Sequence, residues 1–211
     1  MLIAGAGRHT KDLLLVISEQ KTNKEIVFFD DVTAELSEHI FSKYRILRSI
    51  EEAQEFLKTD NSFVLGLGGT NQREIISNKL NDIGGVLTSI ISRNSIIGNF
   101  DINLADGLNI MPNSFISNSV SIGKGTLINT SAKIHHDVKI GKFCDIAPGA
   151  TILGGVYIND FSFIGANATI LPNVKVGMNC KIGAGSVVTK SIPSNSTAVG
   201  VPAKVIKVNN E

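Results

Sequence analysis

Three adjacent residues in the second half of the chain, His135, His136 and Asp137, have the clearest potential for chemistry. A histidine whose pKa lies near its ordinary value of about 6.5 can remove a proton at neutral pH. An adjacent carboxylate orients the ring and raises its basicity. Transfer of an acetyl group from a thioester to an amine or a hydroxyl needs such a base. Taken alone, the triplet also fits a pair of histidines on the protein surface.

Two glycine-rich segments in the first half could hold a phosphate. Residues 5–11, GAGRHTK, follow a strand-like segment and open a helix, whose N-terminal amides attract anions. Thr10 replaces the third glycine of the dinucleotide fingerprint, so the segment is a weak match to an NAD-binding loop. Residues 66–73, GLGGTNQR, expose further amides, and Arg73 could pair with a diphosphate.

The elements that position these residues differ between the two halves, and the second half is a repeat. From Leu104 to Val188 every sixth residue is aliphatic, over fifteen consecutive positions. A six-residue period is typical of a parallel β-helix. A single coil cannot bury its apolar face alone, so the coils must stack. We therefore predict a β-helix over this half.

The first half alternates strand-like and helix-like segments, which favours a small parallel sheet with ligand loops at the carboxyl ends of its strands. Asp30 and Asp31 end the second strand, where an acidic residue can hydrogen-bond a ribose or a base, although either could cap a turn. Strands are predicted over 2–4, 25–29, 62–67 and 85–91, and helices over about 11–20, over 71–82, and from a capping box of Ser49 and Glu52 to Leu57.

Charge and composition separate the halves and exclude several classes of protein. Residues 1–103 hold 25 charged side chains and residues 104–211 hold 14, so we predict two domains, 1–95 and 96–211. The net charge of +1 excludes a broad attraction to nucleic acid or a membrane surface. No apolar run is long enough to span a membrane, and no secretory signal precedes the first strand. We expect a soluble cytoplasmic protein.

The hexads resemble the left-handed β-helix acyltransferases, whose coils contain three hexads. The segment INTSAKIHHD (128–137) matches the motif that carries the catalytic histidine of that family, and AVGVPAKVIK (198–207) is similar to its C-terminal segment. Nearly the whole chain is similar to the sugar acyltransferases that acetylate nucleotide-linked amino sugars or sialic acid. The resemblance implies a Rossmann-like parallel sheet followed by a left-handed β-helix of about five coils.

The same resemblance implies the roles of several residues. It places the general base on His136, beside Asp137, and makes the backbone amide of Gly154, one coil later, a donor to the acetyl carbonyl. Gly154 could also be a plain turn glycine. The family histidine that contacts the thioester region is replaced by Asp145, which cannot donate a hydrogen bond when ionised. The acetyl-CoA contacts expected from the resemblance are Asp145, Gly154, Ala166, Gly185, Lys190 and Lys204.

In the first half the resemblance implies a nucleotide-sugar site. GAGRHTK is similar to the family's GASGHGK loop and keeps its histidine as His9, while Asp30 and Asp31 match an F.DD motif. The substrate contacts expected on this basis are Gly7, Arg8, His9, Asp30, Asp31, Gly68, Asn71 and Arg73. A homotrimer with sites between its subunits is expected, and the four scattered histidines predict no metal site.

The sequence thus predicts an acetyl-CoA-dependent N-acetyltransferase acting on the 4-amino group of a UDP- or dTDP-linked 4-amino-4,6-dideoxy sugar in bacterial surface-glycan synthesis. An O-acetyltransferase of sialic acid would use the same base and cofactor. A non-catalytic β-helix scaffold would instead show repeated Thr or Asn columns and no isolated HHD. An NAD-binding regulator is disfavoured by the broken fingerprint.

Overall fold

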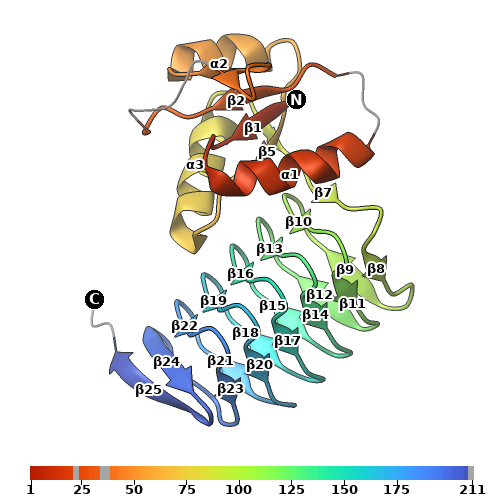
Figure 1. The fold of residues 1–211 in the computed structure, drawn as a ribbon, viewed down its shortest axis with the longest axis vertical. Helices are drawn as coiled ribbons and strands as arrows, with labels where there is room; N and C mark the ends of the chain where they lie inside the picture. The colour runs from red at the N-terminus through yellow and green to blue at the C-terminus, as the bar shows by residue number, and fades with distance from the viewer. Residues whose placement is uncertain (21–23, 34–38, 209–211) are drawn as a thin grey trace.

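The computed structural model describes residues 1–20, 24–33 and 39–208, which form an α/β unit standing on a parallel β-helix (Figure 1). The sheet of the α/β unit has the strand order β3-β4-β2-β1-β5-β6. All its strands are parallel except β3, which is antiparallel to β4. The strands are β1 (Leu2–Ala4), β2 (Val27–Phe29), β3 (His39–Ile40), β4 (Tyr44–Leu47), β5 (Ser62–Leu65) and β6 (Val86–Leu87), and the helices are α1 (Arg8–Glu19), α2 (Ile50–Leu57) and α3 (Thr70–Asp82).

Most of these elements follow the predicted ranges. The capping box of α2 is present, because Ser49 accepts from the Glu52 amide while the Glu52 carboxylate accepts from the Ser49 amide. The β3–β4 hairpin was not predicted. The segment 85–91, predicted as one strand, is divided: β6 pairs with β5, whereas β7 (Ile90–Ile91) pairs with β10 (Asn109–Ile110) of the β-helix.

The left-handed β-helix is a triangular prism with three parallel sheets as its faces. The α/β unit stands on the first face. The first face contains β7, β10, β13 (Leu127–Ile128), β16 (Asp145–Ile146), β19 (Phe163–Ile164), β22 (Lys181–Ile182), β24 (Ser196–Gly200) and the antiparallel β25 (Ala203–Val208). The second face contains β8 (Ile96–Ile97), β11 (Phe115–Ile116), β14 (Lys133–Ile134), β17 (Thr151–Ile152), β20 (Thr169–Ile170) and β23 (Val187–Val188). The third face contains β9 (Ile102–Leu104), β12 (Val120–Ile122), β15 (Lys139–Ile140), β18 (Tyr157–Ile158) and β21 (Lys175–Val176).

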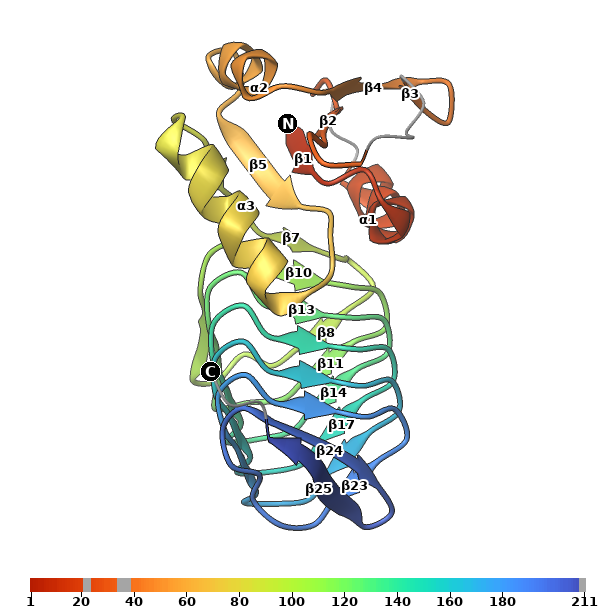
Figure 2. The same ribbon diagram turned by 90° about the vertical axis from the view of Figure 1, so that its left-hand side faces the viewer.

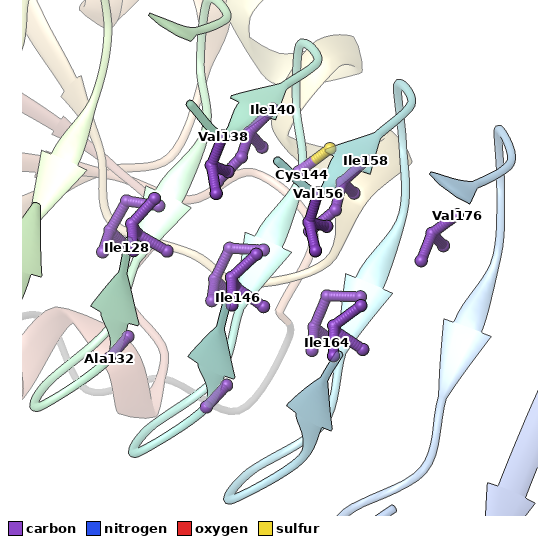
Figure 3. Close-up of a cluster of buried hydrophobic side chains, with 14 of the residues drawn as sticks. Ile128, Ala132, Val138, Ile140, Cys144, Ile146, Val156, Ile158, Ile164 and Val176 are labelled. Atoms are coloured by element: carbon purple, nitrogen blue, oxygen red, sulfur yellow. The ribbon is translucent and has the colours of Figure 1, made fainter. Parts of the chain in front are cut away.

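The aliphatic column predicted from the six-residue period forms the core of the prism. Ile128, Ile146 and Ile164 stack in successive coils, as Figure 3 shows, and each is fully buried. Strands of neighbouring coils lie about 4.8 Å apart, so each branched side chain meets its equivalents above and below. The low aromatic content, 6%, follows from this narrow interior.

The prism begins two strands, β7 and β8, before the start of the regular hexad column at Leu104 in β9. Ile91 and Ile97 lie in register with Ile110 and Ile116, respectively. Seven residues, rather than six, separate Ile97 from Leu104. This single extra residue takes β7 and β8 out of phase with the later strands, so a strict step of six from Leu104 does not find them. The division between residues 95 and 96 stays a prediction.

Each coil turns at three corners, and from Asp101 to Gly185 one residue at every corner has a positive φ. At the corner between the third and first faces, these residues lie 18 positions apart: Gly107, Gly125, Phe143 and Phe161, followed by Asn179. Glycine and asparagine suit this left-handed conformation, whereas phenylalanine is rarely found there. The two phenylalanine rings stack with centroids 6.0 Å apart.

The phenylalanine pair helps to support the α/β unit. Phe143 is buried among side chains of the α/β core, and Phe161 packs against the same cluster. Lys142 lies over the Phe161 ring and 3.7 Å from the carboxylate of Glu74 on α3. The helices α1 and α3 cover opposite faces of the α/β sheet, and Figure 2 shows them on either side of β5, above the coils of the prism. No helix within residues 1–20, 24–33 or 39–208 is long and apolar enough to cross a membrane.

Candidate active site

His136 and Asp137 lie at the corner between the second and third faces of the prism. Asp137 has a positive φ of 60°, and its carboxylate lies 2.8 Å from Nδ1 of His136. An ionised carboxylate only accepts hydrogen bonds, so it favours the tautomer with the proton on Nδ1. Nε2 then keeps a free lone pair. Both side chains are about two-thirds exposed, so this lone pair is accessible to a substrate amine.

Gly154 lies directly beside this histidine in the next coil. A Cβ atom added to Gly154 would lie 2.6 Å from Cε1 and 2.8 Å from Nε2 of His136. The neighbouring amides are bonded, since Leu153 N–H donates to Ile170 and Gly155 N–H donates to His136. No described acceptor receives the Gly154 N–H. A free amide beside the base suits a donor to a developing oxyanion.

The substitution Gly154→Ala is expected to lower kcat about 100-fold with little change in stability. The added methyl group would occupy the place of the His136 ring, which must turn away from its present position. Misplacement of a reacting group by about 1 Å costs roughly this factor. Steady-state kinetics and thermal unfolding of the variant would check both parts. A kcat within threefold of wild type would contradict the expected proximity of this glycine to the reacting atoms.

A cavity of about 390 Å³ lies at the carboxyl ends of the parallel strands, where the nucleotide was expected. Gly5, Gly7, Asp30 and Asp31 line it. Gly7 is the N-cap of α1 and provides no side-chain cap, so the first amides of this helix remain available to an anion. A larger cavity of about 500 Å³, beside β4 and the end of α1, contains none of the predicted site residues.

Asp30 and Asp31 both have partners within the protein. The Asp30 carboxylate accepts from the amides of Ala6, Val32 and Thr33. Burial raises its pKa, but these hydrogen bonds outweigh that effect and hold the pKa below its ordinary value. Asp31 forms an ion pair with a lysine of α3. Asp30 therefore shapes the edge of the pocket as well as lining it.

His9 occupies the first turn of α1 and is mostly buried. Its Nε2 atom is buried and has no hydrogen-bond partner in the described structure. Burial, with the nearby Arg73 cation, lowers the pKa of His9 to about 4, against a smaller opposite effect of Asp12. His9 is therefore neutral at physiological pH.

We expect His9 to make stability depend on pH in the acidic range. The unfolded chain binds a proton at His9 below about pH 6.5, whereas in the folded protein His9 binds this proton only as the pH falls to about 4. Stability from this group is thus present above pH 6.5 and lost as the pH falls toward 4, by about 2–3 kcal/mol. Urea unfolding at pH 7 and 4.5 would show a smaller loss in His9→Gln than in wild type. Equal losses would contradict this account.

Arg73 is fully buried, which corrects the expected contact with a diphosphate. Its Nε donates to the carbonyl of Gly125 at 2.8 Å, and Nη1 donates to Leu67 at 2.7 Å. Nη2 donates to the side chain of Asn109 at 2.9 Å, and that side chain donates in turn to Leu65. Arg73 has no exposed surface, so it joins the α/β unit to the prism instead of meeting substrate.

The residues expected to bind acetyl-CoA lie on different parts of the prism. Asp145 is buried on the first face under the loop 66–69, and its carboxylate accepts from the Gly69 amide at 3.4 Å. Ala166 and Gly185 are adjacent at the corner between the first and second faces, joined by a backbone hydrogen bond of 2.8 Å. Lys190 and Lys204 are exposed near the C-terminal end. Within one chain, Lys190 lies at the same corner as His136 but three coils later, between β23 of the second face and Ile192, which pairs with Val176 of the third face. The other four residues lie away from that corner.

Two family profiles match the sequence. The profile of the PglD N-terminal domain matches residues 1–80, and that of the bacterial transferase hexapeptide repeat matches residues 119–154 and 155–190. No curated protein sequence matches the chain. Many solved structures are similar, including three that match over nearly their whole length.

The first, WeeI from Acinetobacter baumannii, is 26% identical with a TM-score of 0.89, covering 97% of this chain and 98% of that one. The second is a variant of GDP-perosamine N-acetyltransferase from Caulobacter crescentus in complex with CoA and GDP-perosamine. It is 25% identical with a TM-score of 0.87, covering 98% and 96%. The third is the acetyltransferase domain of PglB from Neisseria gonorrhoeae in complex with acetyl coenzyme A. It is 25% identical with a TM-score of 0.86, covering 97% and 98%.

The chain belongs to the hexapeptide-repeat sugar acyltransferases. This acyltransferase holds no cluster of potential metal ligands within its described residues. The cavity of about 390 Å³ is also lined by residues that sequence reasoning did not select: Gln72, Ile75, Ile76 and Lys79. They occupy one face of α3 at helical spacing, and Ile75 is exposed. An exposed isoleucine on that face was a signal that could have identified them.

Proposed function

We propose that this protein is an acetyl-CoA-dependent N-acetyltransferase that acts on the 4-amino group of a nucleotide-linked 4-amino-4,6-dideoxy sugar for a bacterial surface glycan. The observation that carries the proposal is the corner at which the His136 imidazole lies between the Asp137 carboxylate and the unbonded amide of Gly154. This corner supplies a base and an oxyanion donor within one small region.

In the proposed reaction the substrate amine attacks the thioester carbonyl carbon directly. Nε2 of His136 accepts the proton that the amine loses, and Asp137 stabilises the resulting imidazolium through Nδ1. The Gly154 amide donates to the oxyanion of the tetrahedral intermediate. The carbon–sulfur bond then breaks, the CoA thiolate leaves, and the proton on His136 can neutralise it. Cys144 and Cys180, the two cysteines, are buried in the prism, so an acyl-enzyme is not invoked.

The nucleotide is proposed to bind in the pocket of the α/β unit. Its diphosphate would meet the uncapped start of α1 at Gly7 and Arg8, with help from the amides around Gly68. Arg8 is exposed and has no ion-pair partner among the described residues. Asn71 is exposed at the start of α3. Arg73 is not part of this site.

The two halves of the proposed site lie on different sides of one chain. The α/β unit covers the first face of the prism, whereas His136 lies at the opposite corner, between the second and third faces. A second copy would bring its His136 corner toward the pocket, so we propose a homotrimer with active sites and acetyl-CoA between subunits. Mixing His136→Gln with Ile75→Glu, which adds an anion to the pocket, is expected to restore activity that each variant lacks alone.

An amine as the acceptor is supported by the similar GDP-perosamine N-acetyltransferase, which was solved with its nucleotide-linked amino sugar. That relative binds a guanine nucleotide, so GDP joins UDP and dTDP among the nucleotides to be tested. The nearly complete coverage of both chains supports the proposal that this protein shares the whole reaction of that relative as well as its fold.

The test is a panel of acetyl acceptors offered to the purified protein with acetyl-CoA. The panel contains UDP-, dTDP- and GDP-linked 4-amino sugars, the matching 4-hydroxy sugars, and free sialic acids. We expect release of CoA and gain of one acetyl group with an amino sugar only. Acetylation of sialic acids alone would overturn the proposed substrate and support an O-acetyltransferase. No transfer to any acceptor would overturn the proposed reaction.

A further inference from the structure

Asp145 is a buried carboxylate that does not face the proposed base. It projects outward from β16 on the first face, yet the α/β unit covers it and leaves it 7% exposed. Its Oδ2 accepts the Gly69 amide at 3.4 Å, and a Cβ atom at Gly68 would lie 3.4 Å from the same oxygen. The loop thus approaches Asp145 through two glycines, without an intervening side chain.

The surroundings of Asp145 contain one opposite charge. Burial raises its pKa, the Arg73 cation lowers it, and the Gly69 hydrogen bond lowers it further, with burial dominant. Arg73 is held in place by the hydrogen bonds that it donates to Gly125 and Asn109 of the prism and to Leu67 of the loop. The loop is therefore held from one side by Arg73 and from the other by Asp145.

The same loop forms part of the nucleotide pocket. Leu67 and Gln72 line the cavity. Gly69 has a positive φ of 85°, and a Cβ atom there would lie 2.7 Å from the Gln72 side-chain oxygen. A shift of Gly69 would therefore move Gln72, which packs against it, and alter the pocket wall. A chain of contacts connects Asp145 on the prism with the pocket in the α/β unit.

We infer that Asp145 is a positioning residue for nucleotide binding: its carboxylate, through the Gly69 amide, sets the loop that forms the wall of the pocket. The inference rests on the proposed function, and it replaces the acetyl-CoA contact that the family's histidine at this position suggested. Asp145 acts from the prism on the substrate that the α/β unit binds. The position thus couples the two parts of the chain.

The experiment measures each ligand separately in Asp145→Ala and the nearly isosteric Asp145→Asn. Isothermal titration with UDP, dTDP and GDP identifies the nucleoside diphosphate that wild type binds. We expect Asp145→Ala to weaken its binding, and to raise the KM for the nucleotide sugar, about tenfold or more, because a charge-assisted hydrogen bond is lost. Asp145→Asn keeps an acceptor oxygen and is expected to recover part of the binding. The KM for acetyl-CoA should stay within twofold in both variants.

Asp160→Asn is the matched control, because this carboxylate of the prism accepts the Lys142 amide at 2.9 Å and does not touch the loop. It should change neither KM. Thermal unfolding tests whether each variant is folded. If Asp145→Ala does not fold, Asp145→Asn alone tests the inference, and a weaker but measurable loss of nucleotide binding is then expected. Unchanged nucleotide binding, or a rise in the KM for acetyl-CoA alone, overturns the inference. Nucleotide binding without acetyl transfer would sink the proposed function and leave this inference standing.

Discussion

Replacement of His136 by glutamine is expected to lower kcat by a factor of about 100 to 10,000, the usual contribution of a general base. Glutamine fills a similar volume but has no basic lone pair near neutral pH. The ring is exposed and its Nδ1 bonds Asp137 only, so stability should hardly change. The KM values for acetyl-CoA and the sugar should also stay close to wild type, because the base acts in the transition state. Steady-state kinetics with both substrates would measure this.

The neighbouring His135 provides a matched control for this experiment. The centroid of its ring lies 5.9 Å from that of Phe115, and the Asp137 carboxylate bonds the ring of His136 instead. His135→Gln should therefore keep kcat within about threefold. Equal losses in both variants would assign the effect to the fold of the corner instead of to proton transfer. A His136→Gln protein that keeps more than a tenth of the wild-type kcat would contradict the proposed mechanism.

Replacement of Arg73 by methionine is expected to destabilise the protein by about 3–5 kcal/mol, the usual cost of removing one partner from a buried charged network. Methionine fills much of the space but donates no hydrogen bond. The carbonyls of Leu67 and Gly125 and the side chain of Asn109 would lose their donor. Asp145 would lose its nearby cation. Urea unfolding monitored by circular dichroism would measure the loss.

A second substitution separates charge from hydrogen bonding at this junction. In Arg73→Met/Asp145→Asn the uncompensated carboxylate is gone, so the double variant should be more stable than the sum of the single losses predicts. Arg73→Lys keeps the charge without the planar fork and should lie between wild type and Arg73→Met. A loss below about 1 kcal/mol in Arg73→Met would show that the junction does not depend on this side chain.

The parts of the fold that could be predicted are those with a local pattern. A period of six residues can be detected in the sequence alone, and the capping box of Ser49 and Glu52 lies within one helical turn. The first two strands of the prism, β7 and β8, were not found because one extra residue before Leu104 changes their phase. The segment 85–91 reads as one apolar run, and only pairing with distant strands divides it between two sheets.

Burial explains why the candidate site was predicted unevenly. The 18-residue coil correctly brought Gly154 beside His136, because the repeat converts sequence separation into distance. Arg73 follows a glycine loop, as a diphosphate ligand would, but the sequence does not show that the prism closes over it. Asn109 lies within the hexads, where its outward position carries no local sign that Leu65 and Arg73 would meet it.

Phe143 and Phe161 have a consequence for how such chains could be recombined. Their rings occupy corner positions with positive φ, which in the neighbouring coils belong to glycine or asparagine. A β-helix separated from its α/β unit would expose both rings and invite self-association. In a chimera with a different nucleotide-binding unit, the surface of that unit would have to fit against the stacked rings of Phe143 and Phe161. Only α/β units that can cover these two rings could therefore be exchanged on this prism.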